Sequence, residues 1–223
     1  GIGISLATHI AKCAGVSDRK LGDIESDIKS LNAKSFPVLD DARGEEMAQR
    51  ILKAREEADS VGGVTETVIC GTPAGVGEPW FDSVESIISH AAFSLGGVKG
   101  IEFGAGFAAA DMKGSECNDP LRVSGGRIVT TTNNNGGVNG GITNGMPIVF
   151  RCAVKPTPSI AQTQDTVDFI KNENTQLSIH GRHDPAIIRR ICPVLDSVAA
   201  LCVADMLSLR YGTDVLTKGV DDK

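Results

Sequence analysis

Several features that would place the chain in a particular class of protein are missing from its sequence. No run of about 18 or more apolar residues occurs, so nothing predicts a membrane span. The 22 lysines and arginines are outnumbered by 28 acidic residues, and the net charge of −6 disfavours the clustered basic surface of a nucleic-acid-binding domain. We therefore expect neither a membrane nor a nucleic acid as a partner.

Paired metal-binding or disulfide motifs are also absent. The six cysteines form no CxxC pair and no tight group with histidine, so neither a zinc site nor a disulfide framework is indicated. Reduced, structural thiols in a cytoplasmic protein are the better interpretation. The cysteines stand at positions 13, 70, 117, 152, 192 and 202.

The amino end has no initiator methionine and no polar leader. The chain begins GIGISLATHI, where Ile2, Ile4 and Leu6 alternate as in a half-buried strand. We interpret it as a part of a longer protein. Neither an internal repeat nor a linker divides residues 1–223, which we treat as a single domain.

Hydrophobic periodicity predicts a first helix at residues 42–61. Met47, Ile51 and Leu52 form one apolar stripe, and a glycine pair at 62–63 ends it. The preceding polar segment, residues 16–41, predicts only an exposed loop or a short helix.

The rest of the chain interleaves further strands and helices with long, glycine-rich connections, which indicates a mixed α+β fold of sheets packed on helices. Asp82 is the expected cap of the second long helix, and Asp184 with Pro185 the expected start of the last. Pro193 should interrupt or kink that last helix. The expected elements are strands at 64–75, 98–112 and 146–157 and helices at 83–97 and 185–212.

For two glycine-rich or polar loops a purely structural interpretation is sufficient. Residues 71–83 lack the GK[ST] of a phosphate-binding loop and suit a structured turn into a helix. Residues 108–120 read as a solvated loop, or as one that closes over a ligand.

The segment TTTNNNGGVNGGITNG at 130–145 is more informative. Its glycines allow close backbone approach, and its asparagines offer both donors and acceptors, which together suit a polar heteroaromatic ring. Further on, Lys155 and Arg182 supply two cations for an anionic group. Arg182 also stands directly before His183 and Asp184, two residues able to exchange protons.

Several motifs in the same order resemble those of the chorismate synthase family. They are DSVGG, GVGEPWFDSVE, VKGIEFGAGF, KGSECND, TNNNGGVNGGITNGMPIVFRCAVKPTPSI and GRHDP, and they span about residues 54 to 205. The resemblance implies a sandwich of helices between antiparallel sheets, incomplete here at the amino end, and a homotetramer. It also implies a lyase that uses reduced FMN to eliminate phosphate from 5-enolpyruvylshikimate 3-phosphate, with NADPH as reductant in some members.

The resemblance assigns roles to individual residues. It implies Asp184 and Arg182 as catalytic residues, with Asp184 assisting deprotonation of the flavin. It implies flavin or phosphate contacts from Asn134, Asn135, Lys155, Ser159, Arg182 and His183. We expect the asparagine loop and the Arg-His-Asp-Pro corner to converge on opposite sides of one flavin ring.

Other family segments have no counterpart in the chain. A GESHG-like motif, a second catalytic histidine and an ARET-like helix are all missing. The missing part would supply most of the arginines that neutralise the substrate, so we expect little or no activity from this chain alone. One alternative is a non-catalytic fragment that associates with itself through apolar faces, and another is an unrelated nucleotide-binding protein.

Overall fold

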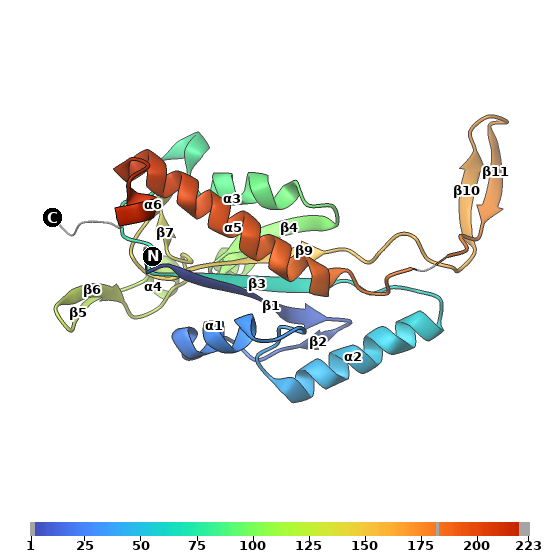
Figure 1. The fold of residues 1–223 in the computed structure, drawn as a ribbon, viewed down its shortest axis with the longest axis horizontal. Helices are drawn as coiled ribbons and strands as arrows, with labels where there is room; N and C mark the ends of the chain where they lie inside the picture. Colours follow the sequence, from blue (N-terminus) through green and yellow to red (C-terminus); the bar gives the residue numbers. More distant parts are fainter. Residues whose placement is uncertain (1–2, 182, 219–223) are drawn as a thin grey trace.

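The fold is built on one antiparallel sheet with helices on both faces (Figure 1). The computed structural model describes residues 3–181 and 183–218. The five strands of the sheet run in the order β2-β1-β3-β9-β4. Their bounds are β1 Ser5–Cys13, β2 Val16–Ser17, β3 Gly63–Cys70, β4 Val98–Phe103 and β9 Ile148–Val154. The expected α+β class is confirmed.

The face of the sheet that carries the main core is covered by α3 (Val84–Phe93) and α5 (Ile188–Tyr211). Side chains alternate along β9, so that Ile148, Phe150 and Cys152 are buried while the residues between them are not. Phe150 contacts Phe103 of β4, with 5.6 Å between the ring centroids.

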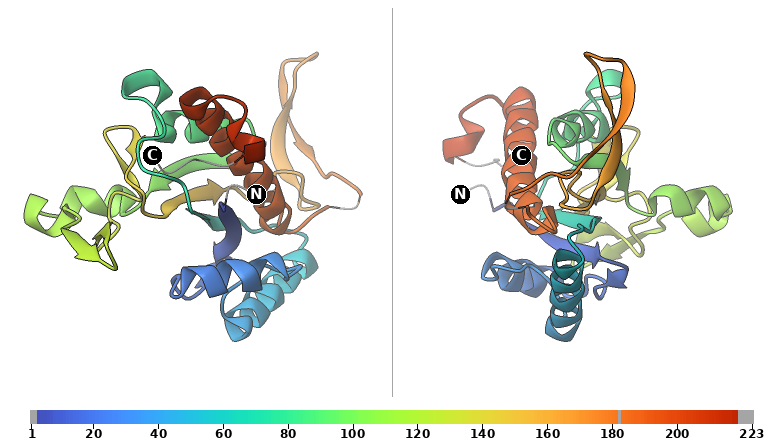
Figure 2. Two further views of the ribbon diagram at one scale, coloured as in Figure 1. Left: turned by 60° about the vertical axis from the view of Figure 1, so that its left-hand side comes forward. Right: turned by 90° about the vertical axis from the view of Figure 1, so that its right-hand side faces the viewer.

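The opposite face carries α1 (Ile24–Asn32), next to α2 (Asp41–Glu56) (Figure 2). Ile28 and Leu31 of α1 pack on Ala7 and Val68 in a smaller apolar cluster. The segment at 16–41, for which the sequence predicts only a loop or a short helix, thus supplies β2, α1 and part of the core.

Two hairpins project from this body (Figures 1 and 2). The first joins β5 (Leu121–Ser124) to β6 (Arg127–Thr130), and the second joins β10 (Gln164–Asp168) to β11 (Glu173–Leu177). The remaining short elements are η1 Trp80–Asp82, η2 Gly106–Asp111, α4 Gly114–Cys117, β7 Val138–Asn139, β8 Ile142–Thr143 and α6 Val215–Lys218.

The first predicted helix ends earlier than its sequence pattern indicated. α2 stops at Glu56 because Ala58 adopts a left-handed φ of 57° and Asp59 N–H donates back to the Ala54 carbonyl. The glycines at 62–63 are instead required by the sheet, since a Cβ on Gly63 would lie 2.2 Å from the Lys12 carbonyl oxygen. Leu52, placed in the apolar stripe, is 52% exposed.

Two predictions at other element ends are wrong. Ser83, not Asp82, caps α3, because its hydroxyl accepts from Ser86 N–H. The strand expected at 98–112 ends at Phe103 and gives way to the 3₁₀ turns of η2. The strand expected from the alternation at the amino end is present as β1, although Ile2 lies outside the described residues.

The last helix begins later than expected and is not interrupted. Asp184 Oδ1 accepts from Ala186 N–H, so this side chain closes a turn before α5, which starts at Ile188. α5 continues through Pro193. Its length and composition would suffice to cross a membrane, a test that core helices also pass, and nine of its side chains are buried.

Burial lowers the reactivity of the core cysteines. All six are free, and Cys13, Cys152 and Cys192 are buried in the core. Burial raises the pKa of the Cys13 thiol to about 11 and that of Cys152 to about 12. Protonated thiols of this kind are poor nucleophiles and poor metal ligands.

Candidate functional site

Three segments meet at one end of the sheet. Lys155 follows β9 directly, and its N–H donates to the carbonyl of Gly97 in the turn between α3 and β4. A Cβ on Gly97, whose φ is 100°, would lie 2.8 Å from Ile187 at the start of α5. Glycine at this position therefore allows the end of β9, the α3–β4 turn and the α5 start to pack together.

Ser159 and His183 are joined across this end by a hydrogen bond of 2.8 Å between Oγ and Nδ1. The other ring nitrogen, Nε2, lies 3.1 Å from the Ile179 carbonyl oxygen. A carbonyl oxygen only accepts hydrogen bonds, so Nε2 carries a proton. In a neutral ring Nδ1 is then unprotonated and accepts a hydrogen bond from the Ser159 hydroxyl. Both polar contacts of His183 are thus satisfied without a charge on the ring.

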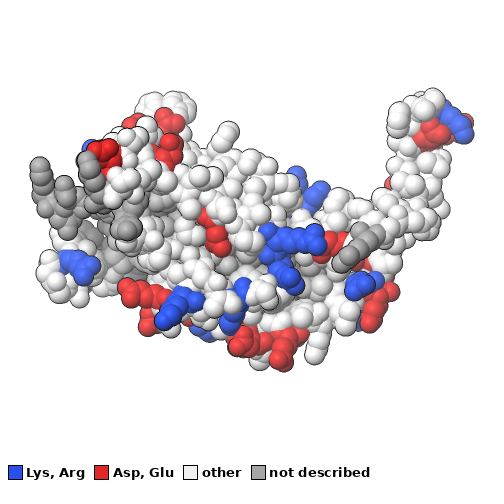
Figure 3. All heavy atoms as spheres, viewed as in Figure 1, with Lys and Arg blue, Asp and Glu red and all other residues white. Residues whose placement is uncertain are grey.

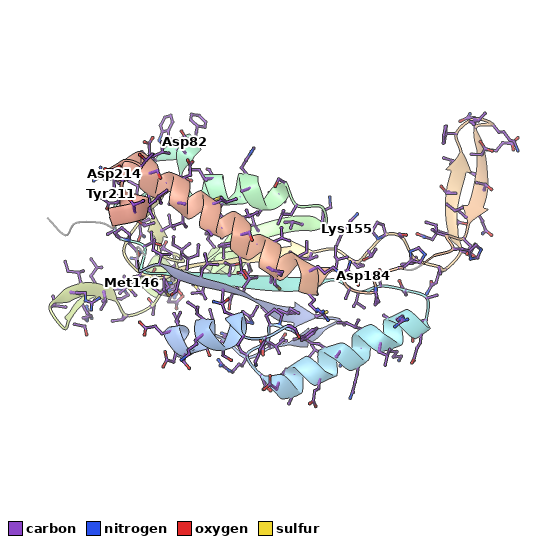
Figure 4. All side chains as sticks on the ribbon, viewed as in Figure 1. Asp82, Met146, Lys155, Asp184, Tyr211 and Asp214 are labelled. Atoms are coloured by element: carbon purple, nitrogen blue, oxygen red, sulfur yellow. The ribbon has the colours of Figure 1, made fainter. Side chains whose placement is uncertain are left out.

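Asp184 follows His183 directly. Its Oδ1 accepts a hydrogen bond from Ala186 N–H, and its Oδ2 faces the exposed side chain of Arg190. Its Oδ2 is 3.2 Å from Nε of Arg190, whose side chain is 77% exposed, while the Asp184 side chain is only 26% exposed. Such an exposed ion pair is worth little free energy, so the carboxylate can exchange Arg190 for another partner at small cost. Figure 4 shows Asp184 and Lys155 at the same end of the sheet.

We call this group of Lys155, Ser159, His183 and Asp184 the corner. Two polar groups here lack a partner: the Thr157 hydroxyl is buried without a hydrogen-bond partner, and no ion pair engages Lys155 within the described residues. A cavity of about 220 Å³ opens beside His183 and Pro185. Lys and Arg side chains also gather over the N-terminal part of α5 (Figure 3). Arg182, predicted to be part of this group, lies outside the described residues.

The asparagine loop is held by a different residue, Asp119. Its two carboxylate oxygens accept from Asn134 N–H, from Asn135 N–H and side-chain amide, and from the Thr132 hydroxyl, at 2.7–2.9 Å. Burial opposes ionisation, but these hydrogen bonds outweigh it and hold the Asp119 pKa below its usual value. The Asn134 amide donates to the carbonyls of Glu116 and Cys117. Both asparagine side chains are therefore committed within the chain.

Close backbone packing fixes this loop against the end of β4. Ala105 N–H donates to the Asn134 carbonyl, and a Cβ on Gly104, whose φ is 55°, would lie 2.1 Å from the same oxygen. Gly136 likewise meets Gly104 and the Val149 carbonyl. The glycines of the loop thus serve packing of the chain on itself.

The asparagine loop and the corner do not converge in one chain. Asn133 contacts the Pro147 carbonyl just before β9, whereas Lys155 follows the last residue of that strand. A strand rises roughly 3.3 Å per residue, so the two groups are separated by about 20 Å or more. Met146 and Lys155 mark the two ends in Figure 4. The expected convergence on one ring is wrong within a single chain, because the extended strand between them holds them apart.

A larger cavity, of about 870 Å³, lies away from the corner, near Asp82 (Figure 4). Three carboxylates, those of Glu78, Asp82 and Asp205, line it against one cation, Arg210. Its negative charge disfavours an anionic ligand, so size alone does not make it the candidate site.

The sequence did not single out every polar group that the fold brings together. Thr157 lies between Lys155 and Ser159, but a single threonine in a loop forms no motif that would mark it as functional. His9 is 1% exposed and lies between two carboxylates. Its partners are far from it in sequence, so only the strand pairing reveals them.

Comparisons with known proteins agree on one family. A family model described as chorismate synthase matches residues 1–208. The chain is 43% identical over 210 residues to a chorismate synthase of Methanosarcina acetivorans, covering 94% of this chain and 57% of the relative. It is 49% identical over 166 residues to the chorismate synthase of Korarchaeum cryptofilum, covering 74% of this chain and 46% of the relative.

A solved structure is also similar. A crystal structure of a chorismate synthase superimposes with a TM-score of 0.76 at 27% identity, covering 95% of this chain and 59% of that one. The chain thus spans about half the length of the relatives it matches. On these grounds the chain belongs to the chorismate synthase family.

Proposed function

We propose that the chain carries the corner at which a chorismate synthase converts 5-enolpyruvylshikimate 3-phosphate to chorismate by 1,4-anti-elimination of phosphate. The observation that carries this proposal is the corner itself. It combines a lysine that has no ion pair among the described residues with a carboxylate whose partner is exchangeable, and the Thr157 hydroxyl between Lys155 and Ser159 has no hydrogen-bond partner. These are the groups that an anionic cofactor and a proton transfer require.

The donor set at the corner fits reduced FMN, which when bound would supply electron density to the departing phosphate. Lys155 and Thr157 offer an ammonium and a hydroxyl to a phosphate or to a ring edge, and Arg182 would add a second cation. Ser159 could donate to the same ligand if its hydroxyl turned away from His183. His183, as a neutral ring, would be a polar contact beside them. The cavity of about 220 Å³ is smaller than pockets that enclose such ligands, which are roughly 300–1,000 Å³. Further walls therefore have to come from outside the described residues.

Asp184 is the residue that we assign to proton transfer. Its carboxylate would release Arg190 and accept a proton at Oδ2, in the role that the family resemblance implies, which is to assist deprotonation of the flavin. The Ala186 N–H holds Oδ1 and so fixes the direction of the second oxygen. Lys155 and Arg182 would meanwhile compensate the negative charge that accumulates as phosphate leaves.

Asn134 and Asn135 remain predicted cofactor contacts. Since they lie at the far end of β9, they could reach a flavin at the corner only from a second copy of the chain. A homotetramer, as the family resemblance implies, would allow this. The same resemblance favours a cytoplasmic enzyme, with NADPH as one reductant for the flavin.

Self-association without catalysis is the second candidate function, and exposed apolar side chains favour it. Leu201 and Leu209 on the outer face of α5 are 71% and 73% exposed, and Phe169 and Ile170 at the tip of the β10–β11 hairpin are 86% and 85% exposed. Apolar surface of this kind drives association. Sedimentation of the chain with and without FMN separates the two candidates, because association independent of flavin supports the second.

A chimera tests the proposed activity. In it, this chain replaces the 210 matched residues of the Methanosarcina acetivorans relative. With reduced FMN and 5-enolpyruvylshikimate 3-phosphate, the chimera should form chorismate, and the 223-residue chain alone should form little or none. The reason is that one described lysine cannot compensate the phosphate and carboxylates of the substrate.

Two outcomes would count against this proposal. A chimera that folds and binds FMN yet forms no chorismate would refute the assigned function. Turnover by the chain alone would refute the claim that residues beyond it are needed.

A further inference from the structure

A histidine on the sheet lies between two carboxylates, far from the corner. His9 of β1 is 1% exposed, with Nδ1 3.0 Å from Asp18 Oδ2 and Nε2 3.1 Å from Glu66 Oε1. The Asp18 side chain is fully buried and that of Glu66 is 16% exposed. Among the described residues no group of histidine, cysteine and carboxylate side chains is arranged to hold a metal ion. The contacts are therefore hydrogen-bonded ion pairs.

The geometry fixes the charge of the ring. Carboxylate oxygens only accept hydrogen bonds, so each ring nitrogen of His9 needs a proton to satisfy its contact. A neutral imidazole has one N–H, and its other nitrogen would point a lone pair at a carboxylate. No neutral tautomer satisfies both contacts, whereas the imidazolium does. His183, which faces a carbonyl and a hydroxyl, has no such requirement.

Asp18 links this ring to the segment that leads into α2. Its Oδ2 also accepts from Leu39 N–H at 2.6 Å, and its Oδ1 accepts from Asp40 N–H at 2.9 Å and from Arg19 N–H at 2.8 Å. Leu39 belongs to the apolar cluster beneath α1, and Asp40 caps α2. One carboxylate thus ties the sheet to the layer of α1 and α2.

Other charged groups around His9 are paired among themselves. Arg19 pairs with Asp27 of α1, and Arg151, opposite Glu66 in the β3–β9 register, pairs with Glu102 of β4. Burial alone would lower the pKa of His9, but the hydrogen bonds to Asp18 and Glu66 outweigh it and raise that pKa above 6.5. Burial would raise the pKa of Asp18, yet its hydrogen bonds from His9, Leu39 and Asp40 lower it below 3.8.

We propose that His9 is a pH-sensitive latch, whose imidazolium holds the 37–40 segment and the α1–α2 layer on the sheet and whose deprotonation loosens them. Since the folded-state pKa of His9 is raised, its stabilisation is complete below pH 6.5 and is lost as the pH rises through the folded value. The contribution of Asp18 is present above pH 3.8 and is lost as the pH falls through its lowered value. The latch is therefore strongest between these limits.

Nitrogen-15 NMR of the histidine rings tests the charge directly. At about pH 7.5 both ring nitrogens of His9 should carry protons. Between about pH 6 and pH 9, exchange of the Leu39 and Asp40 amides, corrected for its intrinsic pH dependence, should accelerate by about tenfold or more. A single neutral tautomer of His9 at a pH of about 7 would overturn the proposal.

A conservative variant separates the latch from a merely structural histidine. In Glu66→Gln the side-chain amide can donate to Nε2, so a neutral His9 is satisfied and should lose its proton at lower pH, with a tenfold or greater drop in proton affinity. The pH dependence of Leu39 and Asp40 exchange should then shrink. An unchanged His9 titration in a folded Glu66→Gln variant would contradict the latch, as would exchange that keeps its full pH dependence.

Discussion

Chorismate formation by the chimeric enzyme is expected to fall by roughly 10²–10⁴-fold when Asp184 is replaced by alanine, the usual loss for a residue that transfers a proton. The Asp184 carboxylate is the described acidic group of the corner, and its partner Arg190 is exposed enough to leave it. Alanine removes the proton acceptor and, with it, the Oδ1 contact to Ala186 N–H. The measurement is the turnover number with reduced FMN and saturating substrate.

The matched control is Arg190→Ala, which removes the ion pair and keeps the carboxylate. Its turnover should change by less than a few fold, because an exposed pair contributes about 0–1 kcal/mol. Flavin affinity should stay similar in both variants if Asp184 acts on the proton and does not hold the ring. Full turnover in a folded Asp184→Ala chimera would remove its catalytic role.

Replacing Phe150 by alanine is expected to lower the free energy of unfolding by about 3–5 kcal/mol. Phe150 is 1% exposed at the centre of β9, where it meets Phe103 and the core beneath α3 and α5. The cavity left behind cannot close easily, because strands on both sides fix the backbone. Urea denaturation followed by far-UV circular dichroism measures the change.

Phe169→Ala provides the comparison, since Phe169 is the same residue type at 86% exposure on the β10–β11 hairpin. Its unfolding free energy should change by no more than about 0.5 kcal/mol. Equal losses in the two variants would mean that the sheet face carrying Phe150 is not the centre of the core.

The sequence predicted the long, strongly patterned elements and failed mainly at their ends. Alternation along β9 and the apolar stripe of α5 are local signals, and both elements are present. The end of α2 depends on a left-handed Ala58, a conformation that alanine rarely adopts and that no residue pattern announces. The sequence pattern indicates that the glycines at 62–63 end the helix. In the fold, Gly63 is required because a Cβ there would collide with the neighbouring strand β1.

The candidate site shows the same limit: the sequence shows which residues are neighbours along the chain, but not the distances between separate segments in the fold. Adjacent residues such as His183 and Asp184 are necessarily close, and Lys155 stood out as a cation at a strand end. The family resemblance added Ser159, whose contact with His183 the fold supplies. The distance between the asparagine loop and the corner is set by the length of β9, and family motifs carry no such distance. The partners of His9 are likewise brought together only by the pairing of β1 with β3.

The central claim is that the corner, at the Lys155 end of β9, holds the cofactor. FMN titration of the chimera by fluorescence quenching, with Lys155→Ala compared with Asn134→Ala, tests it most directly. Loss of a charge-assisted hydrogen bond costs about 1.5–3 kcal/mol, so Lys155→Ala should weaken FMN binding by roughly 10–100-fold and Asn134→Ala by less. Unchanged affinity in Lys155→Ala, together with a loss in Asn134→Ala, would contradict the claim.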